Sequence, residues 1–276
     1  MDKTTFYLKW VFIVIMIVLC PLTFSHAAMI GNWSFDEGSG NSVYDSTGNF
    51  APGSINGAQF TTGILNTGIV FSGWWPHGGT DYENYKIDDV TIPSKDIFYA
   101  TGEITLSMWV SIADLDNSYS PFIFQKKPGG GTIQFAITPD DILEVAPSGA
   151  SKSLYLNDLS INRWYYMALV LGSESALLYI DGVLTDEADF SGMSINDSPL
   201  IFGSNTITPD YYPWYVNPFS GIIDEVHLYD HALTQSQILE DMNMTIPGPA
   251  TILLLGSGLI GLVVMRRKWG VPAIVD

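Results

Sequence analysis

The feature that most constrains this chain is a series of short apolar segments separated by turn signals roughly every ten residues. Residues 104–112 show it most clearly, because Ile104, Leu106, Met108, Val110 and Ile112 alternate along one side. Such alternation predicts strands with one buried face. Helical stretches are missing between these segments, which excludes a run of βαβ units. The sequence therefore predicts an all-β fold, a two-sheet antiparallel β-sandwich of jelly-roll type.

The last of these segments, residues 220–229, carries an acidic residue in an apolar row. By the strand period, one face of the segment holds Ile222, Asp224, Val226 and Leu228. We therefore expect Asp224 to point inward, where a carboxylate needs a partner because burial of an unpaired charge is costly. A helix should follow directly, since Thr234 and Gln237 have the spacing of an N-terminal capping box.

Residues 1–27 have the features of a secretory signal peptide. Lys3 and Lys9 give a positive start, residues 10–19 are apolar, and residues 25–27 (Ser-His-Ala) form a small-x-small cleavage site. An uncleaved membrane anchor is the alternative, although the apolar run is short for a membrane span. The only cysteine, Cys20, would leave with the signal. The exported protein would then rely on its core, or on a metal, instead of disulfides.

The charge balance is strongly acidic. The chain has 29 Asp and Glu residues against 11 Lys and Arg, a formal net charge of −18. Nucleic acid is excluded as a partner on this basis, because phosphate binding needs Lys and Arg. A soluble, acidic, secreted surface or the binding of a cation suits this charge.

Four groups of motifs, taken together and in order, resemble one family. The groups are Trp33–Gly40 with Asp45–Gly48, Ile104–Val110, Trp164–Val170 with Leu178–Gly182, and Gly221–Tyr229 with Ala232–Thr234. Their order and spacing resemble the laminin-G-like jelly roll of the concanavalin A-like lectin/glucanase superfamily. The resemblance covers about residues 29–241, and the predicted domain spans residues 28–243. It implies that the closing strand lies against the opening strand.

The C-terminal residues resemble a PEP-CTERM sorting signal of Gram-negative bacteria. Residues 247–251 (Pro-Gly-Pro-Ala-Thr) precede an apolar run at 252–265 and a basic cluster at 266–268. Gly248 stands where a Glu is usual, so the match is to the Pro-x-Pro form. The apolar run, at about 1.5 Å per residue, is just long enough for a transmembrane helix. We assign residues 244–269 to this signal and residues 270–276 to a tail.

The resemblance implies that an exosortase-type membrane protease processes this C-terminal signal. The basic cluster should stay cytoplasmic, so the domain would be held on the outer side of the inner membrane until cleavage. The expected location is the cell surface or the extracellular polysaccharide matrix of a Gram-negative bacterium. A plain C-terminal membrane anchor is the alternative.

A structural Ca²⁺ ion is one hypothesis for the first and last strands. In the superfamily that the chain resembles, these strands lie close together and often share Ca²⁺, which would place Asp36 and Asp224 as ligands. Ca²⁺ takes carboxylate and carbonyl oxygens. The alternative is that Asp224 only accepts hydrogen bonds from backbone amides in a turn.

Two aromatic segments are the candidate carbohydrate-binding surface. They contain Trp74, Trp75 and Tyr82 in the first segment and Tyr211, Tyr212 and Trp214 in the second. Sugars stack on exposed aromatic faces, and exposed aromatic clusters mark binding surfaces. The alternative is that these rings roof the sandwich or pack on each other.

Catalytic motifs are weak in this sequence. Glucanases of this architecture place paired carboxylates on one strand, with an E-x-D-x-E-like spacing. Glu187-Ala188-Asp189 is the nearest match and lacks the third carboxylate. The histidines His77, His227 and His231 show no metal-ligand spacing on a helix. We therefore expect a protein that is not an enzyme.

The sequence thus favours an exported binding or structural protein with a polysaccharide or glycoconjugate as partner. Two alternatives stay open. One is a glycoside hydrolase or polysaccharide lyase of concanavalin A-like fold, and the other is a purely structural matrix protein.

Overall fold

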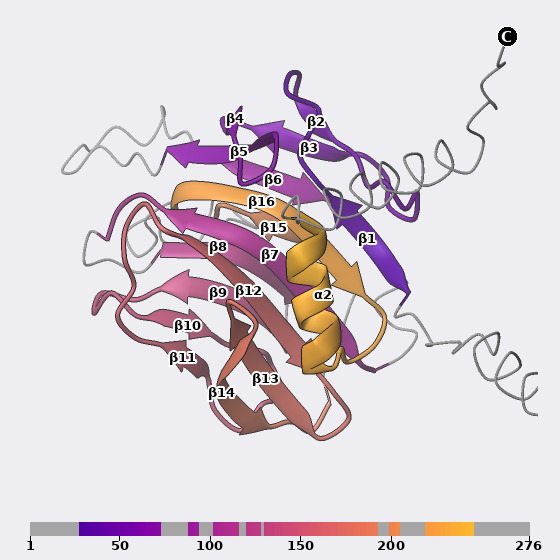
Figure 1. Ribbon diagram of the computed structural model, residues 1–276, viewed down its shortest axis with the longest axis vertical. Helices are drawn as coiled ribbons and strands as arrows, with labels where there is room; N and C mark the ends of the chain where they lie inside the picture. Colours follow the sequence, from indigo (N-terminus) through magenta and orange to yellow (C-terminus); the bar gives the residue numbers. More distant parts are fainter. Residues whose placement is uncertain are drawn as a thin grey trace, which may run out of the picture.

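In the part of the chain that it describes, the computed structural model is a sandwich of two antiparallel eight-stranded sheets with one helix packed outside it (Figure 1). It describes residues 28–72, 88–93, 102–115, 120–127, 130–192, 199–204 and 219–245. The predicted all-β, two-sheet architecture is confirmed. The predicted signal peptide and nearly all of the predicted C-terminal signal lie outside these ranges. No helix within them has the length and apolar character needed to cross a membrane.

Sheet A has the strand order β14-β13-β12-β7-β16-β5-β4, with β1 also paired to β16. Its strands are β1 (Met29–Trp33), β4 (Gln59–Thr62), β5 (Thr67–Ser72), β7 (Ile104–Ile112), β12 (Trp164–Leu171), β13 (Ser175–Ile180), β14 (Val183–Asp189) and β16 (Ser220–Tyr229). The opening and closing strands are neighbours as predicted, since Trp33 pairs with Val226. The β13–β14 turn uses Asp181 and Gly182, both with positive φ.

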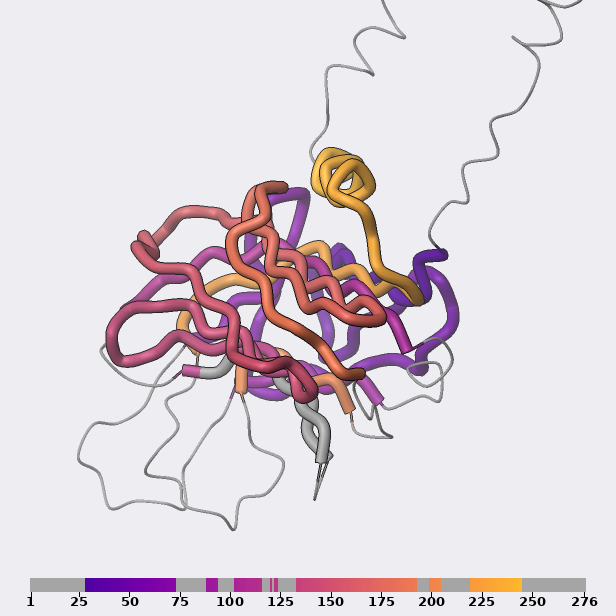
Figure 2. Tube along the Cα trace, turned by 90° about the horizontal axis from the view of Figure 1, so that it is seen from below, coloured from indigo at the N-terminus to yellow at the C-terminus, as the bar shows by residue number. Residues whose placement is uncertain are grey.

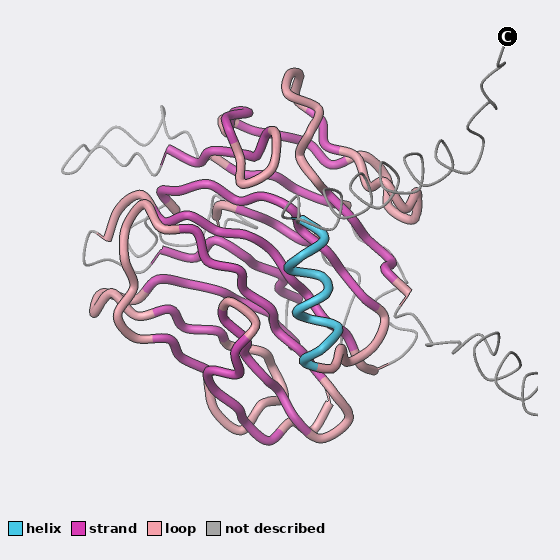
Figure 3. Tube along the Cα trace, in the orientation of Figure 1, coloured by secondary structure: helices cyan, strands magenta, loops and turns pink. Residues whose placement is uncertain are grey.

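Sheet B has the strand order β11-β10-β9-β8-β15-β6-β3-β2. Its strands are β2 (Ser42–Val43), β3 (Gly53–Asn56), β6 (Asp89–Ile92), β8 (Ser120–Lys127), β9 (Gly130–Ile137), β10 (Leu143–Val145), β11 (Leu154–Leu156) and β15 (Leu200–Phe202). Figure 3 shows the two sheets stacked face to face, with loops at both ends of the strands. The sandwich therefore offers two ends at which loops from both sheets meet.

The main core fills the space between the sheets. The alternate residues of β7 that the sequence indicated, from Ile104 to Ile112, all belong to it. Trp33, Phe35 and Phe135 are among its fully buried side chains. Burial of apolar surface stabilises a fold by about 25 cal/mol per Å². The chain has a single cysteine and so no internal disulfide, which leaves this burial as the main stabilising contribution.

The strand β16 contains a β-bulge that corrects the sequence prediction. Ile223, Val226 and Leu228 belong to the main core. The first two are three residues apart, instead of the two residues that regular strand alternation requires. The register against β7 shifts between Asp224 and His227, and Glu225 has a φ of 49°. The bulge inserts an extra residue. Asp224 therefore shares a face with Ile222 and not with Val226, so the expected inward row was wrong for Ile222 and Asp224 and confirmed for Val226 and Leu228.

The helix α2 (Gln235–Thr245) follows β16 and lies across the outer face of sheet A (Figures 1 and 2). Its capping box is confirmed: the Gln237 Oε1 atom accepts the backbone N–H of Thr234 at 2.9 Å, and the Gln237 N–H lies 3.4 Å from the Thr234 hydroxyl. The helix runs two residues past the predicted domain end at 243, so the domain extends to Thr245.

Candidate functional site

The two aromatic segments lie outside the described residues. Trp74, Trp75 and Tyr82 fall within 73–87, and Tyr211, Tyr212 and Trp214 fall within 205–218. The assignment of these residues to ligand binding therefore stays a prediction. The structure does describe the residues that flank each segment on both sides.

Those four flanking positions lie together at one end of the sandwich, and we call them the neck: Ser72, Asp88, Ser204 and Phe219. Ser72 pairs with Ser220, the neighbour of Phe219, across β5 and β16. The Phe219 N–H donates to the carbonyl of Gly203 at 3.2 Å, which joins the ends of the second segment. Covalent continuity means that both aromatic segments begin and end at this neck.

Asp88 closes the base of the first segment. Its Oδ2 atom accepts the backbone N–H of Ser72 at 2.8 Å and also a short hydrogen bond from the Ser72 hydroxyl. Asp88 is buried, so this carboxylate is held by donors and not by water. Its two contacts fix the ends of residues 73–87 against each other.

Packed rings support the neck from the core side. The Phe219 ring lies 5.0 Å from that of Phe122 and 6.0 Å from that of Phe71, measured between centroids. Gly203 has a φ of 87°, and a Cβ there would overlap the Phe71 ring and lie 2.8 Å from the Asp88 carbonyl oxygen. Only glycine fits this close approach. The neck is thus a rigid, close-packed base.

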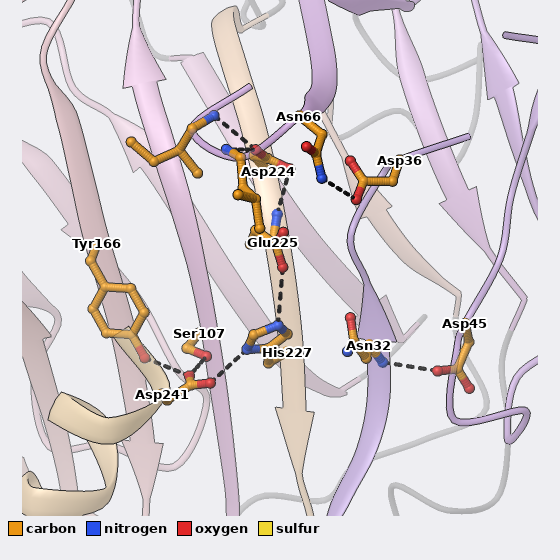
Figure 4. Close-up of polar contacts among 12 residues, drawn as sticks. Asn32, Asp36, Asp45, Asn66, Ser107, Tyr166, Asp224, Glu225, His227 and Asp241 are labelled. Carbon is orange, nitrogen blue, oxygen red and sulfur yellow. Dashed lines mark hydrogen bonds and ion pairs between the residues drawn. The ribbon is translucent and has the colours of Figure 1, made fainter. Parts of the chain in front are cut away.

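Asp36 and Asp224, the predicted metal ligands, are both bound to the turn between β4 and β5 (Figure 4). Asp224 Oδ2 accepts the N–H groups of Ile64 at 2.9 Å and Leu65 at 3.2 Å, while its Oδ1 accepts the N–H of Glu225 at 2.8 Å. Asp36 accepts the Thr67 N–H at 3.1 Å and the Asn66 side-chain amide at 3.0 Å.

This arrangement does not fit a shared Ca²⁺ site. Both oxygens of Asp224 face N–H donors, whose positive ends would repel a cation at the same position. Within the described ranges, no three His, Cys, Asp or Glu side chains form a group that could hold a metal ion. The two carboxylates instead satisfy the backbone of one turn, which is the alternative that the sequence left open for Asp224. Calcium binding itself stays an untested prediction.

Burial changes the acidity of Asp224. Loss of water raises the pKa of this carboxyl to about 7, which outweighs the lowering effect of the three amides that it accepts. Asp224 is fully buried at the position where the neighbour of β16 changes from β5 to β1. The carboxylate thus acts as a structural anchor at a junction of three strands.

Asp45 anchors a second turn in the same way. It accepts the backbone N–H groups of Asn32, Thr47, Asn49 and Phe50 at 2.8–3.0 Å. Burial alone would raise its pKa, but the Thr47 hydroxyl and these amides outweigh burial and hold the pKa of Asp45 below its usual value. The Asp45–Gly48 turn was evident in the sequence, whereas the long-range bond to Asn32 was not.

A third buried polar cluster was missed by the sequence reasoning. It lies under α2 and joins Asp241 to Ser107, Tyr166, His227 and Tyr229 (Figure 4 labels all but Tyr229). These residues come from α2, β7, β12 and β16. No motif spacing links them, because the sheet brings together residues more than 130 positions apart.

This cluster is a poor candidate for catalysis. His227 and Asp241 are 3% and 1% exposed, so no substrate can reach them in the observed state. The other described histidine, His231, is paired with Asp230 at 2.7 Å at the surface. Glu187 and Asp189 project from β14, the edge strand of sheet A, without a third carboxylate in an E-x-D-x-E pattern. His77 lies outside the described residues.

The sequence matches the family Laminin_G_3, described as the concanavalin A-like lectin/glucanases superfamily, over residues 84–239. A search of curated proteins found no significant match. The described fold extends beyond the matched range at both ends, because β1 to β5 precede it and Asp241 of α2 follows it.

Solved structures share the fold at low sequence identity. Domain 4 of AbnA, an extracellular GH43 arabinanase from Geobacillus stearothermophilus solved in complex with arabinotriose, matches with a TM-score of 0.55 and 22% identity, covering 78% of this chain and 98% of that domain. The botulinum neurotoxin serotype C1 binding domain matches with a TM-score of 0.61, 16% identity and coverages of 79% and 52%. A sialidase from Trypanosoma rangeli matches with a TM-score of 0.56, 14% identity and coverages of 76% and 32%.

These matches differ in extent. The chain spans nearly all of the arabinanase domain, about half of the toxin binding domain and about a third of the sialidase. At these identities they establish the fold alone, which binding domains and enzymes share. The family match covers more than half of the chain and agrees with the two-sheet sandwich, so the protein belongs to the concanavalin A-like lectin/glucanase superfamily.

Proposed function

We propose that this protein is an exported, non-catalytic carbohydrate-binding protein of the cell surface or the extracellular polysaccharide matrix. The observation that carries this proposal is the structural match to an arabinanase domain solved with arabinotriose, since this chain covers 98% of that domain. A polysaccharide or glycoconjugate is therefore the proposed partner.

The neck supports a single binding surface built from both aromatic segments. Ser72 and Asp88 bound the first segment, Ser204 and Phe219 bound the second, and all four residues meet at one end of the sandwich. A surface that combines the rings of both segments could stack on two or more sugar units of one chain. The rigid base would limit the entropy lost on binding.

The chemistry of the neck suits binding more than hydrolysis. The Oδ2 atom of Asp88 accepts two hydrogen bonds from Ser72, so this carboxylate has a structural role at the base of the first segment. Glycoside hydrolysis needs two carboxyl groups that flank the scissile bond. The described neck residues supply only this one carboxyl group.

Binding to a polysaccharide panel that includes arabinan tests the proposal. Affinity electrophoresis and calorimetry with the purified protein should identify at least one glycan that binds. Trp74→Ala and Trp214→Ala should each weaken binding about tenfold, equivalent to about 1.4 kcal/mol. Tyr44→Ala is the matched control, because Tyr44 is an exposed aromatic residue that lies outside both segments.

The alternatives give different results in the same experiment. Release of reducing sugar or of an unsaturated product would indicate a hydrolase or a lyase. Flat binding curves across the panel would favour a purely structural matrix protein. If the two Trp variants bind the glycan as tightly as Tyr44→Ala and the wild type do, the aromatic segments do not contribute to the binding site.

The proposed export and sorting rest on the sequence of residues 1–27 and 244–269. An exosortase-type protease and transient anchoring in the inner membrane are part of the proposal. The intact mass of the protein isolated from its producing cells tests both processing steps. A mass that includes either segment would contradict cleavage at that end.

A further inference from the structure

The helix α2 covers a small apolar cluster that is separate from the main core. The buried members of this cluster are Trp109, Tyr166, Ala168, Val170, Tyr179, Tyr229, Leu233 and Ile238. All of them except Leu233 and Ile238 project from the outer face of sheet A. The main core lies on the opposite face of the same sheet. The helix could therefore leave the sheet without opening the main core.

Only two side chains of the helix are deeply buried. Ile238 is 0% exposed and Asp241 is 1% exposed, whereas the neighbouring Leu239 is 38% exposed and Met244 is 63% exposed. A helix of 11 residues is marginal in water by itself. Ile238 and Asp241 therefore dominate the attachment of α2, to which the partly buried Met242 and a hydrogen bond from the Gln235 side-chain amide to the Gly182 carbonyl, at 3.1 Å, also contribute.

Asp241 binds the helix to three strands. Its Oδ2 accepts the hydroxyl groups of Ser107 and Tyr166, each at 2.5 Å. Its Oδ1 accepts the Tyr229 hydroxyl at 2.7 Å and the Nδ1 of His227 at 2.6 Å. Both lone pairs of each oxygen are thus engaged, and this buried carboxylate has a full set of donors.

His227 supplies the positive charge of the cluster. Its Nδ1 faces Asp241 of α2, and its Nε2 lies 3.5 Å from Glu225 Oε2 at the bulge of β16. From β7, the neutral Ser107 is its pairing partner, and the hydroxyls of Ser107 and Tyr166 both donate to Asp241. From β1, the neutral Asn32 stands opposite it. On β16 itself, the Tyr229 ring lies 6.5 Å from the His227 ring between centroids, and its hydroxyl donates to Asp241. The histidine is therefore the one cation among the described groups of this cluster, between two carboxylates.

We propose that α2 is a latch whose docking on sheet A is controlled by the protonation of His227. With the imidazolium present, Asp241 is paired and the helix stays docked. Loss of that proton leaves Asp241 and Glu225 buried without a cation, which strongly destabilises the docked state. The helix then leaves the sheet so that Asp241 becomes hydrated, while the sandwich stays folded.

The acidity of His227 gives the direction of this switch. Burial would lower its pKa, but the hydrogen bonds and charges of Asp241 and Glu225 outweigh burial and raise the pKa to about 9. The latch is therefore closed at neutral pH and opens on the alkaline side. Release would add 11 residues, at most about 3.5 Å each, to the tether between the sandwich and the chain beyond Thr245.

Hydrogen exchange measured by mass spectrometry on the full protein tests the latch. Between pH 7 and pH 10, after correction for the intrinsic rate, amides of residues 235–245 should lose at least about tenfold more protection than those of β7 and β12.

Two variants and a matched control separate the latch from general instability. His227→Gln should lower the protection of α2 at pH 7 and remove its pH dependence. Tyr229→Phe, which deletes one donor to Asp241 and keeps the ring, should lower the protection of α2 at every pH and leave β7 unchanged. His231→Gln is the control for the loss of a histidine, because His231 pairs with Asp230 and not with α2. Its ring also contacts that of Tyr229, so the control readout is the pH dependence of α2 protection, which should stay as in the wild type.

Two results would overturn the proposal. Loss of protection in α2 and in β7 at the same pH would make the helix an inseparable part of the sandwich. Protection of α2 that is constant from pH 7 to pH 10 in the wild type would show that His227 does not control docking. If His227→Gln does not fold, the wild type and Tyr229→Phe still distinguish these results. None of the readouts depends on carbohydrate binding.

Discussion

Ile223 and Val226 both point into the main core although they are three residues apart in one strand. The bulge between them contains Asp224, whose carboxylate accepts the N–H of Glu225 and two N–H groups of the β4–β5 turn. At the same place β16 changes its neighbour from β5 to β1. Asp224 therefore stabilises a bulge, a turn and a change of strand partner at once.

Removal of this carboxylate should destabilise the protein severely. Asp224→Ala leaves one buried and two partly buried backbone N–H groups without their acceptor, and an unsatisfied buried group costs about 1–3 kcal/mol. We expect a loss of about 3 kcal/mol or more in the free energy of unfolding, measured by urea denaturation. Asp36→Ala is the control, because Asp36 binds the same turn from an exposed position and should cost about 1 kcal/mol or less. Equal losses in both variants would contradict the anchoring role.

The raised pKa of Asp224 predicts a pH dependence with a defined sign. The pKa is about 7 in the folded state and about 3.9 in the unfolded chain. The folded state thus binds more protons between these values, and the free energy of unfolding should fall as pH rises from 4 to 7. The full effect is about 4 kcal/mol.

The variant Asp224→Asn isolates this contribution. Urea denaturation of the wild type and the variant at pH 4, 5.5 and 7 gives the difference, in which the other carboxyl groups cancel. From pH 4 to pH 7, the free energy of unfolding of Asp224→Asn should rise by several kcal/mol relative to that of the wild type, because only the wild type must bury a charged carboxylate at high pH. A difference that is constant with pH would mean that Asp224 keeps an ordinary pKa in the fold.

Chelation tests the calcium hypothesis. Because the oxygens of Asp224 face amide donors, we expect the midpoint of thermal unfolding to be the same with 1 mM Ca²⁺ as with an excess of EDTA, within about 1 °C. A midpoint that falls by several degrees on chelation and recovers on addition of Ca²⁺, but not of Mg²⁺, would show a calcium site. Asp36→Ala and Asp224→Asn would then decide whether these carboxylates contribute to it.

The parts of the fold that could be predicted from the sequence are those set by local patterns. The alternation of β7 and the capping box of Thr234 and Gln237 are short-range signals, and both were confirmed. The bulge at Glu225 was not predicted, because a positive φ at Glu225 depends on tertiary contacts that override the local preference. One extra residue reverses the alternation across the bulge, so Val226 and Leu228 point inward as predicted, whereas Ile222 and Asp224, which precede it, lie on the other face.

The polar clusters show a similar limit. Asp224 could be identified as an unusual carboxylate because it interrupts an apolar strand. Asp241 could not, because an acidic residue on a short surface helix is ordinary in a sequence and two of the three strands that supply its donors, β7 and β12, are distant in the chain. The opening and closing strands could be paired only through the resemblance to a family. Sequence alone does not specify which distant strands become neighbours.

The neck gives the last prediction, which links stability to binding. Asp88→Ala removes the acceptor for the N–H and the hydroxyl of Ser72, so the two ends of residues 73–87 are no longer joined by side-chain bonds. If both aromatic segments form one carbohydrate-binding surface, this change should weaken glycan binding about tenfold. Calorimetry with the glycan identified on the polysaccharide panel measures the affinity.

Two further variants make the test specific. Gly203→Ala should destabilise the neck more strongly, by about 2–4 kcal/mol, because the added methyl group overlaps the Phe71 ring and the positive φ disfavours any Cβ. Asp45→Ala is the matched control, since it also removes a buried carboxylate that anchors backbone amides, but in the turn that follows β2. A glycan affinity that falls equally in Asp88→Ala and Asp45→Ala would indicate a general loss of stability. A fall confined to the Asp88 and Gly203 variants would tie binding to the end of the sandwich where both segments begin.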